Sequence, residues 1–207
     1  MTPRPRRPPR PSQDPGPADT ERPSDPPGDP EFVAREICLR LLAQQARSRA
    51  QLATALTRRG IPPDVVERVL SRFTDVGLIN DRAFAETFVV ARHRDRGLAR
   101  RALSVELRRR GVDQTTVAEA LTEIDSDTEE ATARTLIRRR LPATRGLEPT
   151  ARLRRLAGLL ARKGYPPGLA YRVVREELAA EDPAAADDLP EEDFTLTGDD
   201  GVPEVET

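Results

Sequence analysis

The feature that most constrains the fold of this chain is an internal repeat centred on three glycines. Gly60, Gly111 and Gly164 are 51 and 53 residues apart. In each copy, leucines lie eight and four residues before the glycine, two basic residues come directly before it, and apolar residues follow at positions +1, +6, +9 and +10. Agreement at so many positions is not expected by chance. A period of this length predicts one supersecondary unit that is stacked several times along the chain.

Each copy has the pattern of two helices joined by a tight turn. Leucines four residues apart lie on one face of a helix, and basic residues in its last turn suit the negative end of the helix dipole. The glycine is expected to take the left-handed conformation that closes the helix. The following helix is expected to begin at Pro62-Pro63 and at Pro166-Pro167 in the outer copies, and at an N-cap residue, Asp113, in the middle copy.

A further helix is expected upstream of each pair, so the chain is predicted to be all-α, with three tandem three-helix repeats. The three additional helices are predicted over residues 32–46, 81–95 and 128–141, and two capping boxes over Ser48–Gln51 and Ser126–Glu129. We place the repeats at residues 31–80, 81–125 and 126–180. A unit of about 50 residues buries little apolar surface alone, so the units are expected to stack in an elongated array.

The ends of the chain have a different composition from the repeats. Eleven of the 20 prolines precede Glu31, and the segment from Ala179 to Thr207 holds eleven acidic residues and no basic one. Segments with so few large apolar residues do not offset their ordering entropy. We therefore predict a disordered Pro/Arg-rich leader at residues 1–30 and a disordered acidic tail at residues 181–207.

The net charge of −1 conceals a basic core, because residues 31–178 contain 29 basic and 19 acidic residues. Such asymmetry indicates a polyanionic partner and an acidic tail. The alternative is that charge runs only solvate helix faces, but a basic pair recurs at one point of every unit, which favours a shared face. The predicted binding residues are Arg58, Arg59, Arg92, Arg94, Arg96, Arg100, Arg101, Arg108, Arg109, Arg110, Arg162 and Lys163.

Nothing in the sequence supports catalysis, a cofactor or a metal site. His93 is the only histidine, and Cys38 is the only cysteine and lies in an apolar helical segment. Phosphate-binding loops, nucleophile elbows and zinc-ligand spacings are absent from the sequence. We find no signal peptide and no apolar run of the roughly 18 residues that span a bilayer. The prediction is a cytoplasmic, monomeric, non-enzymatic protein without membrane contact.

The middle repeat contains three pieces in a fixed order, which are the stretch from Gly77 to Arg92, Gly97, and the helix end from Glu106 to Val112. Together they resemble the RecX family of bacterial regulatory proteins, and the resemblance extends over residues 31–178. It implies tandem three-helix repeats. It also implies binding to the RecA recombinase filament on DNA along its helical groove, with inhibition of ATP turnover and strand exchange, in recombination, DNA repair and the SOS response.

Two other classes of function remain open from the residues alone. A stand-alone DNA-binding regulator of helix-turn-helix type would show sequence-selective DNA binding, whereas a purely protein-binding helical scaffold would show little dependence on salt. For the acidic tail, we hypothesise that it competes with nucleic acid for the basic face.

Overall fold

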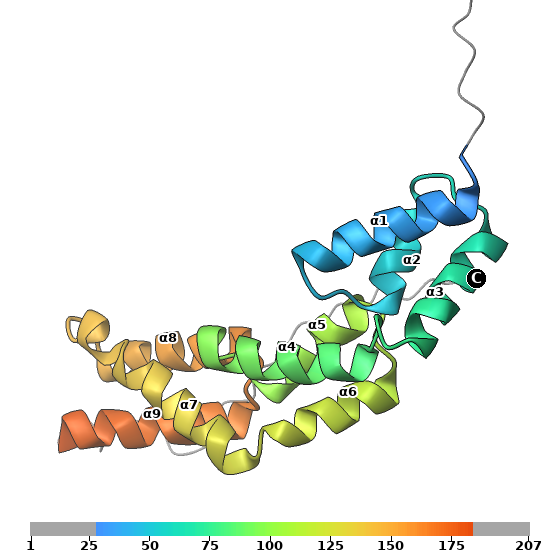
Figure 1. The fold of residues 1–207 in the computed structure, drawn as a ribbon. Helices are drawn as coiled ribbons and strands as arrows, with labels where there is room; N and C mark the ends of the chain where they lie inside the picture. Colours follow the sequence, from blue (N-terminus) through green and yellow to red (C-terminus); the bar gives the residue numbers. More distant parts are fainter. Residues whose placement is uncertain (1–27, 184–207) are drawn as a thin grey trace, which may run out of the picture.

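The computed structural model describes residues 28–183, which form nine α-helices and two short 3₁₀ helices and contain no strand (Figure 1). The helices are α1 (Pro30–Gln44), α2 (Arg49–Thr57), α3 (Pro63–Asp75), α4 (Asp81–Arg96), α5 (Arg100–Arg109), α6 (Gln114–Ala120), η1 (Leu121–Glu123), α7 (Ser126–Arg138), η2 (Leu141–Thr144), α8 (Pro149–Arg162) and α9 (Pro167–Glu181).

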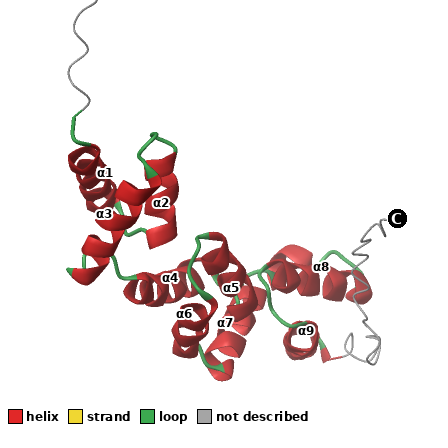
Figure 2. Cartoon of the chain, turned by 90° about the vertical axis from the view of Figure 1, so that its right-hand side faces the viewer, coloured by secondary structure: helices red, strands yellow, loops and turns green. Residues whose placement is uncertain are grey.

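The helices form three successive groups, α1–α3, α4–α6 and α7–α9, which we call units 1, 2 and 3. Each unit has its own cluster of buried apolar side chains. The units follow one another in an elongated row, with unit 1 turned upward at one end (Figures 1 and 2). The predicted all-α fold of three three-helix repeats is confirmed, whereas the boundaries that we place between the repeats remain a proposal.

The predicted leader and tail fall largely outside the described residues, in 1–27 and 184–207. At their inner edges they meet the first and last helices. Pro30 begins α1, with Asp29 as its N-cap, and α9 continues to Glu181.

The predicted glycine turns are confirmed. Gly60, Gly111 and Gly164 have φ values of 75°, 78° and 87°, in the left-handed region that side chains disfavour. After the turns, α3 and α9 begin at the predicted proline pairs, and the Asp113 side chain accepts a hydrogen bond from Thr116 N at the start of α6.

Two details at the helix ends differ from prediction. Of the two expected capping boxes, the one at Ser48 and Gln51 is present, but the one at Ser126 is not, because Asp125 occupies the N-cap position and accepts from Thr128 N. Glu129 instead accepts a hydrogen bond from Arg100 N in unit 2. In addition, the helix expected over 128–141 stops at Arg138 and is followed by the 3₁₀ helix η2.

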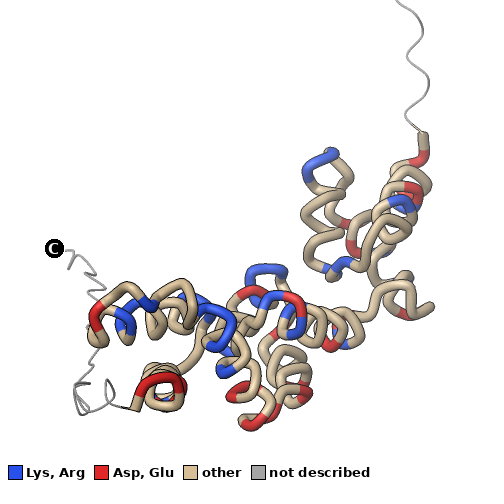
Figure 3. The backbone as a smooth tube through the Cα atoms, turned by 90° about the vertical axis from the view of Figure 1, so that its left-hand side faces the viewer, with Lys and Arg blue, Asp and Glu red and all other residues tan. Residues whose placement is uncertain are grey.

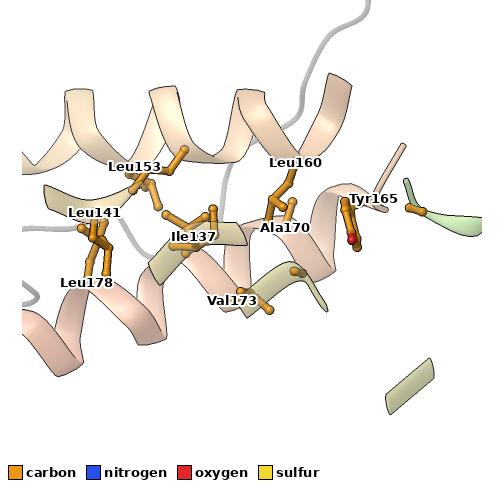
Figure 4. Packing of buried hydrophobic residues seen from close by; sticks show 12 residues of the cluster. Ile137, Leu141, Leu153, Leu160, Tyr165, Ala170, Val173 and Leu178 are labelled. Atoms are coloured by element: carbon orange, nitrogen blue, oxygen red, sulfur yellow. The ribbon is translucent and has the colours of Figure 1, made fainter. Parts of the chain in front are cut away.

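Unit 3 has a core built from all three of its helices (Figure 4). Ile137 of α7 lies between Leu153 and Leu160 of α8 on one side and Val173 of α9 on the other. Full burial of one such side chain stabilises a fold by about 1.5–3 kcal/mol. Ala99 of unit 2 belongs to the same cluster, so the cores of units 2 and 3 are linked by direct packing.

Both junctions between units use the repeated glycine in the same way. A Cβ on Gly111 would lie 2.2 Å from the Cβ of Ala50 in α2, and one on Gly164 would lie 2.7 Å from the Cβ of Ala102 in α5. Each of these glycines therefore packs directly on the N-terminal turn of the middle helix in the preceding unit. The absence of a side chain at this glycine thus permits both the left-handed turn and the close contact between units.

Polar contacts at the two junctions also correspond. The carbonyl just before the glycine accepts a hydrogen bond from the N-cap residue of the preceding unit, from Ser48 Oγ to Arg110 O at 2.5 Å and from Ala99 N to Lys163 O at 2.9 Å. The next N–H donates to a carboxylate of the following unit. Arg49 N lies 2.8 Å from Asp81 Oδ1, and Arg100 N lies 2.7 Å from Glu129 Oε1. The helix N-termini thus gain partners across each junction.

The two ends of the array lack this contact. A Cβ on Gly60 would meet nothing within 4 Å. In unit 3, α8 begins at Pro149, so the position that corresponds to Ser48 and Ala99 is occupied by Arg152 inside the helix. Arg152 is buried and pairs with Glu181. The repeat contact therefore cannot be continued at this end by the same geometry.

Candidate nucleic-acid interface

The structure places nine of the twelve predicted binding residues with exposed side chains, and Arg92, Arg110 and Lys163 with half-buried ones. Arg92 and Arg110 lie against the ring of Phe88, with guanidinium carbons 5.3 Å and 4.6 Å from its centroid. Contact with an aromatic face stabilises such cations. These two arginines are therefore held by unit 2 itself.

Three other predicted residues come together at the junction of units 2 and 3. Arg94 and Arg96 from the end of α4 and Lys163 from the end of α8 line one open pocket of about 720 Å³. The end of α7 adds Arg139 and Arg140, so that five basic residues meet around this hollow. We call it the junction pocket. Figure 3 shows several Lys and Arg segments in the middle of the array, whereas Asp and Glu segments are spread over the lower edge, the ends and unit 1.

Among residues 28–183, one carboxylate, Asp95, lines the junction pocket, and its Oδ1 accepts from Arg94 Nε at 3.1 Å. Arg96 makes a long contact of 4.0 Å with Glu106. Arg139 and Arg140 form no ion pair with any residue in 28–183. The cations of the pocket are therefore largely uncompensated within the described chain.

The positive charges in the pocket lie close enough together to affect the pKa of Lys163. Burial, together with the nearby Arg96 and Arg140, lowers the pKa of its ammonium group below the ordinary value of 10.5. Its Nζ donates a hydrogen bond to the Arg96 carbonyl. Like charges this close disfavour one another's charged forms, so an anion placed among them would relieve a repulsion that is built into the fold.

Three helix ends explain why basic residues meet here. α4, α7 and α8 all terminate at the junction pocket, and cations in the last turn of a helix are stabilised by the partial negative charge of its free carbonyls. This local effect favours the basic residues at all three ends, including Arg94 and Arg96 in the last turn of α4 and the consecutive pair Arg139 and Arg140 directly after the last residue of α7.

His93 forms part of the framework behind the pocket. It is buried, its Nδ1 lies 2.8 Å from the Leu98 carbonyl, and its Nε2 lies 2.8 Å from Thr132 Oγ1 of unit 3. A carbonyl can only accept, so Nδ1 carries a proton. The sequence placed His93 in a helix without a catalytic partner, but the bond that it makes across the junction could not be read from spacing.

The remaining predicted residues are distributed over other parts of the surface. Arg100 and Arg101 line a second, shallower hollow of about 360 Å³ beside Gly164. Arg108 and Arg109 end α5, Arg162 ends α8, and Arg58 and Arg59 lie at the open Gly60 end of the array. The structure thus joins only some of the predicted residues into one site, and a single strip along all three units remains a prediction.

Basic residues on the other side of α7 are used within the fold. Arg138 contacts both carboxylate oxygens of Glu177, with Nε–Oε2 and Nη2–Oε1 distances of 2.7 Å and 2.9 Å. Arg134 pairs with Glu130 and with carboxylates of α9. These pairs fasten α9 to α7. The free bases therefore lie on one side of α7 and the paired bases on the other.

Other chemistry finds no support in residues 28–183. No group of three or more potential metal-ligating side chains occurs there, and none of the described helices is long and apolar enough to cross a membrane. Cys38 is fully buried, and burial raises the pKa of its thiol to about 11. The predicted buried free thiol is confirmed.

The fold and this site define a class of protein, an all-helical repeat array with a cationic pocket at a junction between repeats. Comparison with known proteins specifies the family. Profiles described as the first, second and third three-helix domains of RecX match residues 34–73, 80–121 and 127–174. The chain belongs to the RecX family.

Individual relatives agree with this assignment. The regulatory protein RecX of Thermobifida fusca is 60% identical over 148 residues, which are 72% of this chain and 80% of the relative. That of Streptomyces coelicolor is 57% identical over 157 residues, covering 76% and 84%. A crystal structure of RecX from Lactobacillus salivarius has the same fold at 19% identity, with a TM-score of 0.67 over 72% of this chain and 97% of that chain.

Proposed function

We propose that this protein binds the RecA–DNA filament and modulates, mostly by inhibiting, its ATPase and strand-exchange activities. The observation that carries the proposal is the convergence of Arg94, Arg96, Arg139, Arg140 and Lys163 at one junction, where Asp95 is the one carboxylate that the described part of the chain contributes. The chain that holds this junction belongs to the RecX family. An uncompensated cationic surface of this kind fits a polyanionic partner.

The proposed mechanism is steric and electrostatic. An elongated array with its units fixed by glycine contacts lies along the filament groove and bridges several recombinase protomers, which hinders filament dynamics and strand exchange. The basic residues contact DNA phosphate or acidic recombinase surface. The protein acts as a cytoplasmic monomer, without catalysis and without a cofactor.

The alternative, a regulator that reads DNA bases with one helix after each glycine turn, fits the structure less well. Such a recognition helix needs side chains free to enter the major groove. In unit 2 this helix, α6, has seven residues and no basic one. In unit 3 it is α9, and its Glu176 and Glu177 pair with arginines of α7. These features favour the filament modulator.

The test is a titration of the protein into a recombinase filament on single-stranded DNA, with ATP hydrolysis measured at two salt concentrations. The expected result is inhibition that requires more protein at the higher salt, because contacts with phosphate weaken steeply as salt rises. Base-selective retention of bare DNA with unchanged ATP hydrolysis would favour the regulator. Salt-independent inhibition would favour a protein-binding scaffold.

A further inference from the structure

We infer that the junction pocket is a discrete phosphate-binding site formed only when units 2 and 3 are packed together. This inference rests on the proposed function and deepens it, because it names one part of the basic surface and the chemical group that this part takes. The site is made by residues from three helices, α4, α7 and α8, and its volume of about 720 Å³ is in the range of small-ligand sites.

The geometry suits a multiply charged oxyanion. Guanidinium groups present planar pairs of N–H donors to phosphate oxygens. Arg139 and Arg140 are exposed and form no ion pair with a carboxylate in residues 28–183. A phosphate group would therefore not have to displace an existing ion pair. The rest of the wall is mixed, with the leucines Leu98, Leu136 and Leu159 beside Thr132 and Thr135, so the basic side chains are the groups that an anion would contact.

The pocket depends on the junction that holds it. Gly97 allows α4 to turn against unit 3, since a Cβ there would lie 2.8 Å from Leu136 Cδ1. Tyr165 OH donates to the Gly97 carbonyl at 3.2 Å. Because the residues on the two sides belong to different units, a bound phosphate group also links the units. Phosphate occupancy is therefore expected to stabilise the junction as well as to anchor the nucleic acid.

Phosphate could come from a nucleic-acid backbone or from a free polyphosphate, and the experiment separates these sources. The test variant is R139Q/R140Q, and the matched control is R40Q/R72Q. The control removes the same charge from two exposed arginines of unit 1 that make no ion pair with described residues. The first measurement is the thermal unfolding midpoint of the full chain with inorganic pyrophosphate, against chloride at equal ionic strength. The second is binding of a labelled single-stranded oligonucleotide over a series of salt concentrations.

The expected result is a rise of the midpoint with pyrophosphate in the wild-type protein and in R40Q/R72Q but not in R139Q/R140Q. In addition, the slope of log K against log salt should fall in magnitude by about 1.4 in R139Q/R140Q, since each lost contact with a single strand removes about 0.7. A pyrophosphate effect with an unchanged slope would assign the pocket to a free polyphosphate.

Equal slopes in the two variants, with no pyrophosphate effect that depends on residues 139 and 140, would overturn the inference. The proposed function would still stand in that case if the wild-type protein and R139Q/R140Q inhibited the filament ATPase equally. If the wild-type protein did not inhibit the filament at all, the proposed function would fail, whatever the pocket binds.

Discussion

At the scale of a single residue, two separate features favour glycine at the repeated position, namely a positive φ and close contact with a neighbouring unit. All three glycines have positive φ, but only Gly111 and Gly164 touch a neighbouring unit, whereas Gly60 faces open space. A side chain is therefore expected to strain the backbone at all three positions, but to clash with a neighbouring unit only at Gly111 and Gly164. This difference supplies an internal control within one chain.

We predict that Gly60→Ala and Gly111→Ala both lower the free energy of unfolding by about 1–2 kcal/mol through left-handed strain. Gly111→Ala should cost a further ~1–3 kcal/mol, because its methyl group meets Ala50. Urea unfolding of the two variants measures the difference. Equal losses of stability at the two positions would show that the close approach of units 1 and 2 is absent in solution.

The site residues show which features a sequence can predict. The glycine turns, the proline helix starts and the buried Cys38 depend on local conformation and on apolar periodicity, and all of them were predicted. The junction pocket was not, because Arg94 and Arg139 are 45 positions apart in the sequence and meet only through a contact between units. Glu129 differs from prediction for the same reason. Its carboxylate was expected to complete a capping box at the start of its own helix, but it accepts a hydrogen bond from Arg100 N of the neighbouring unit.

At the scale of a helix, the Ser48 side chain both caps α2 and makes a hydrogen bond across the junction of units 1 and 2. Its Oγ accepts from Gln51 N at the start of α2 and donates to the carbonyl of Arg110 in unit 2. Asp113 caps α6 in a similar manner but makes no bond to another unit. The two caps share the bond to the backbone of their own helix; Ser48 is in addition buried, belongs to a capping box and makes the contact across the junction.

Replacing Ser48 with Ala is predicted to cost about 0.5–2 kcal/mol as a lost cap, with a further ~0.5–1.5 kcal/mol for the bond to Arg110. Asp113→Ala should lose only the first contribution. Thermal unfolding of both variants, followed by circular dichroism, gives the comparison. A Ser48→Ala loss no larger than that of Asp113→Ala would contradict the role of Ser48 at the junction.

The fastening of α9 to the rest of unit 3 is predicted to be sensitive to acid. Hydrogen bonds from Arg134 and Arg172 lower the pKa of Glu130, and those from Arg152 and Arg145 lower that of Glu181, both from an ordinary value of 4.5. A carboxylate with a lowered pKa in the folded state contributes stability above its unfolded pKa and loses it as pH falls through the folded value. Unit 3 should therefore keep this stability at neutral pH and lose it progressively below pH 4.5.

The measurement is the unfolding midpoint at neutral and acidic pH for the wild-type protein and for Glu130→Gln/Glu181→Gln. The double variant should be less stable at neutral pH and should lose less stability on acidification. Identical pH profiles would indicate that these ion pairs contribute nothing to the stability of unit 3.

At the scale of the whole molecule, the charge of the core is opposed by that of the C-terminal segment. Residues 184–207, which lie outside the described range, carry nine acidic residues and no basic one. Glu181 is needed inside unit 3 through its contacts with Arg145 and Arg152, so a truncation that tests the tail must leave it in place.

We predict that removing residues 184–207 increases affinity for single-stranded DNA at low salt, because the tail no longer competes for the basic surface, and that the gain shrinks as salt screens the charges. Fluorescence anisotropy with a labelled oligonucleotide measures both. Unchanged DNA affinity at low salt would contradict the hypothesis that the tail competes with nucleic acid.

The central claim is that the junction pocket faces the RecA–DNA filament. Cys38 is buried with a raised thiol pKa, so a cysteine introduced on the surface can be labelled selectively with a photocrosslinker. Arg140→Cys places the label at the pocket, and Ala118→Cys places it on an exposed site of α6 beside the acidic residues Glu119 and Glu123. On a filament assembled on single-stranded DNA, the account predicts efficient crosslinking to DNA or recombinase from position 140 and little from position 118. Equal crosslinking from both positions, or crosslinking from position 118 alone, would contradict it.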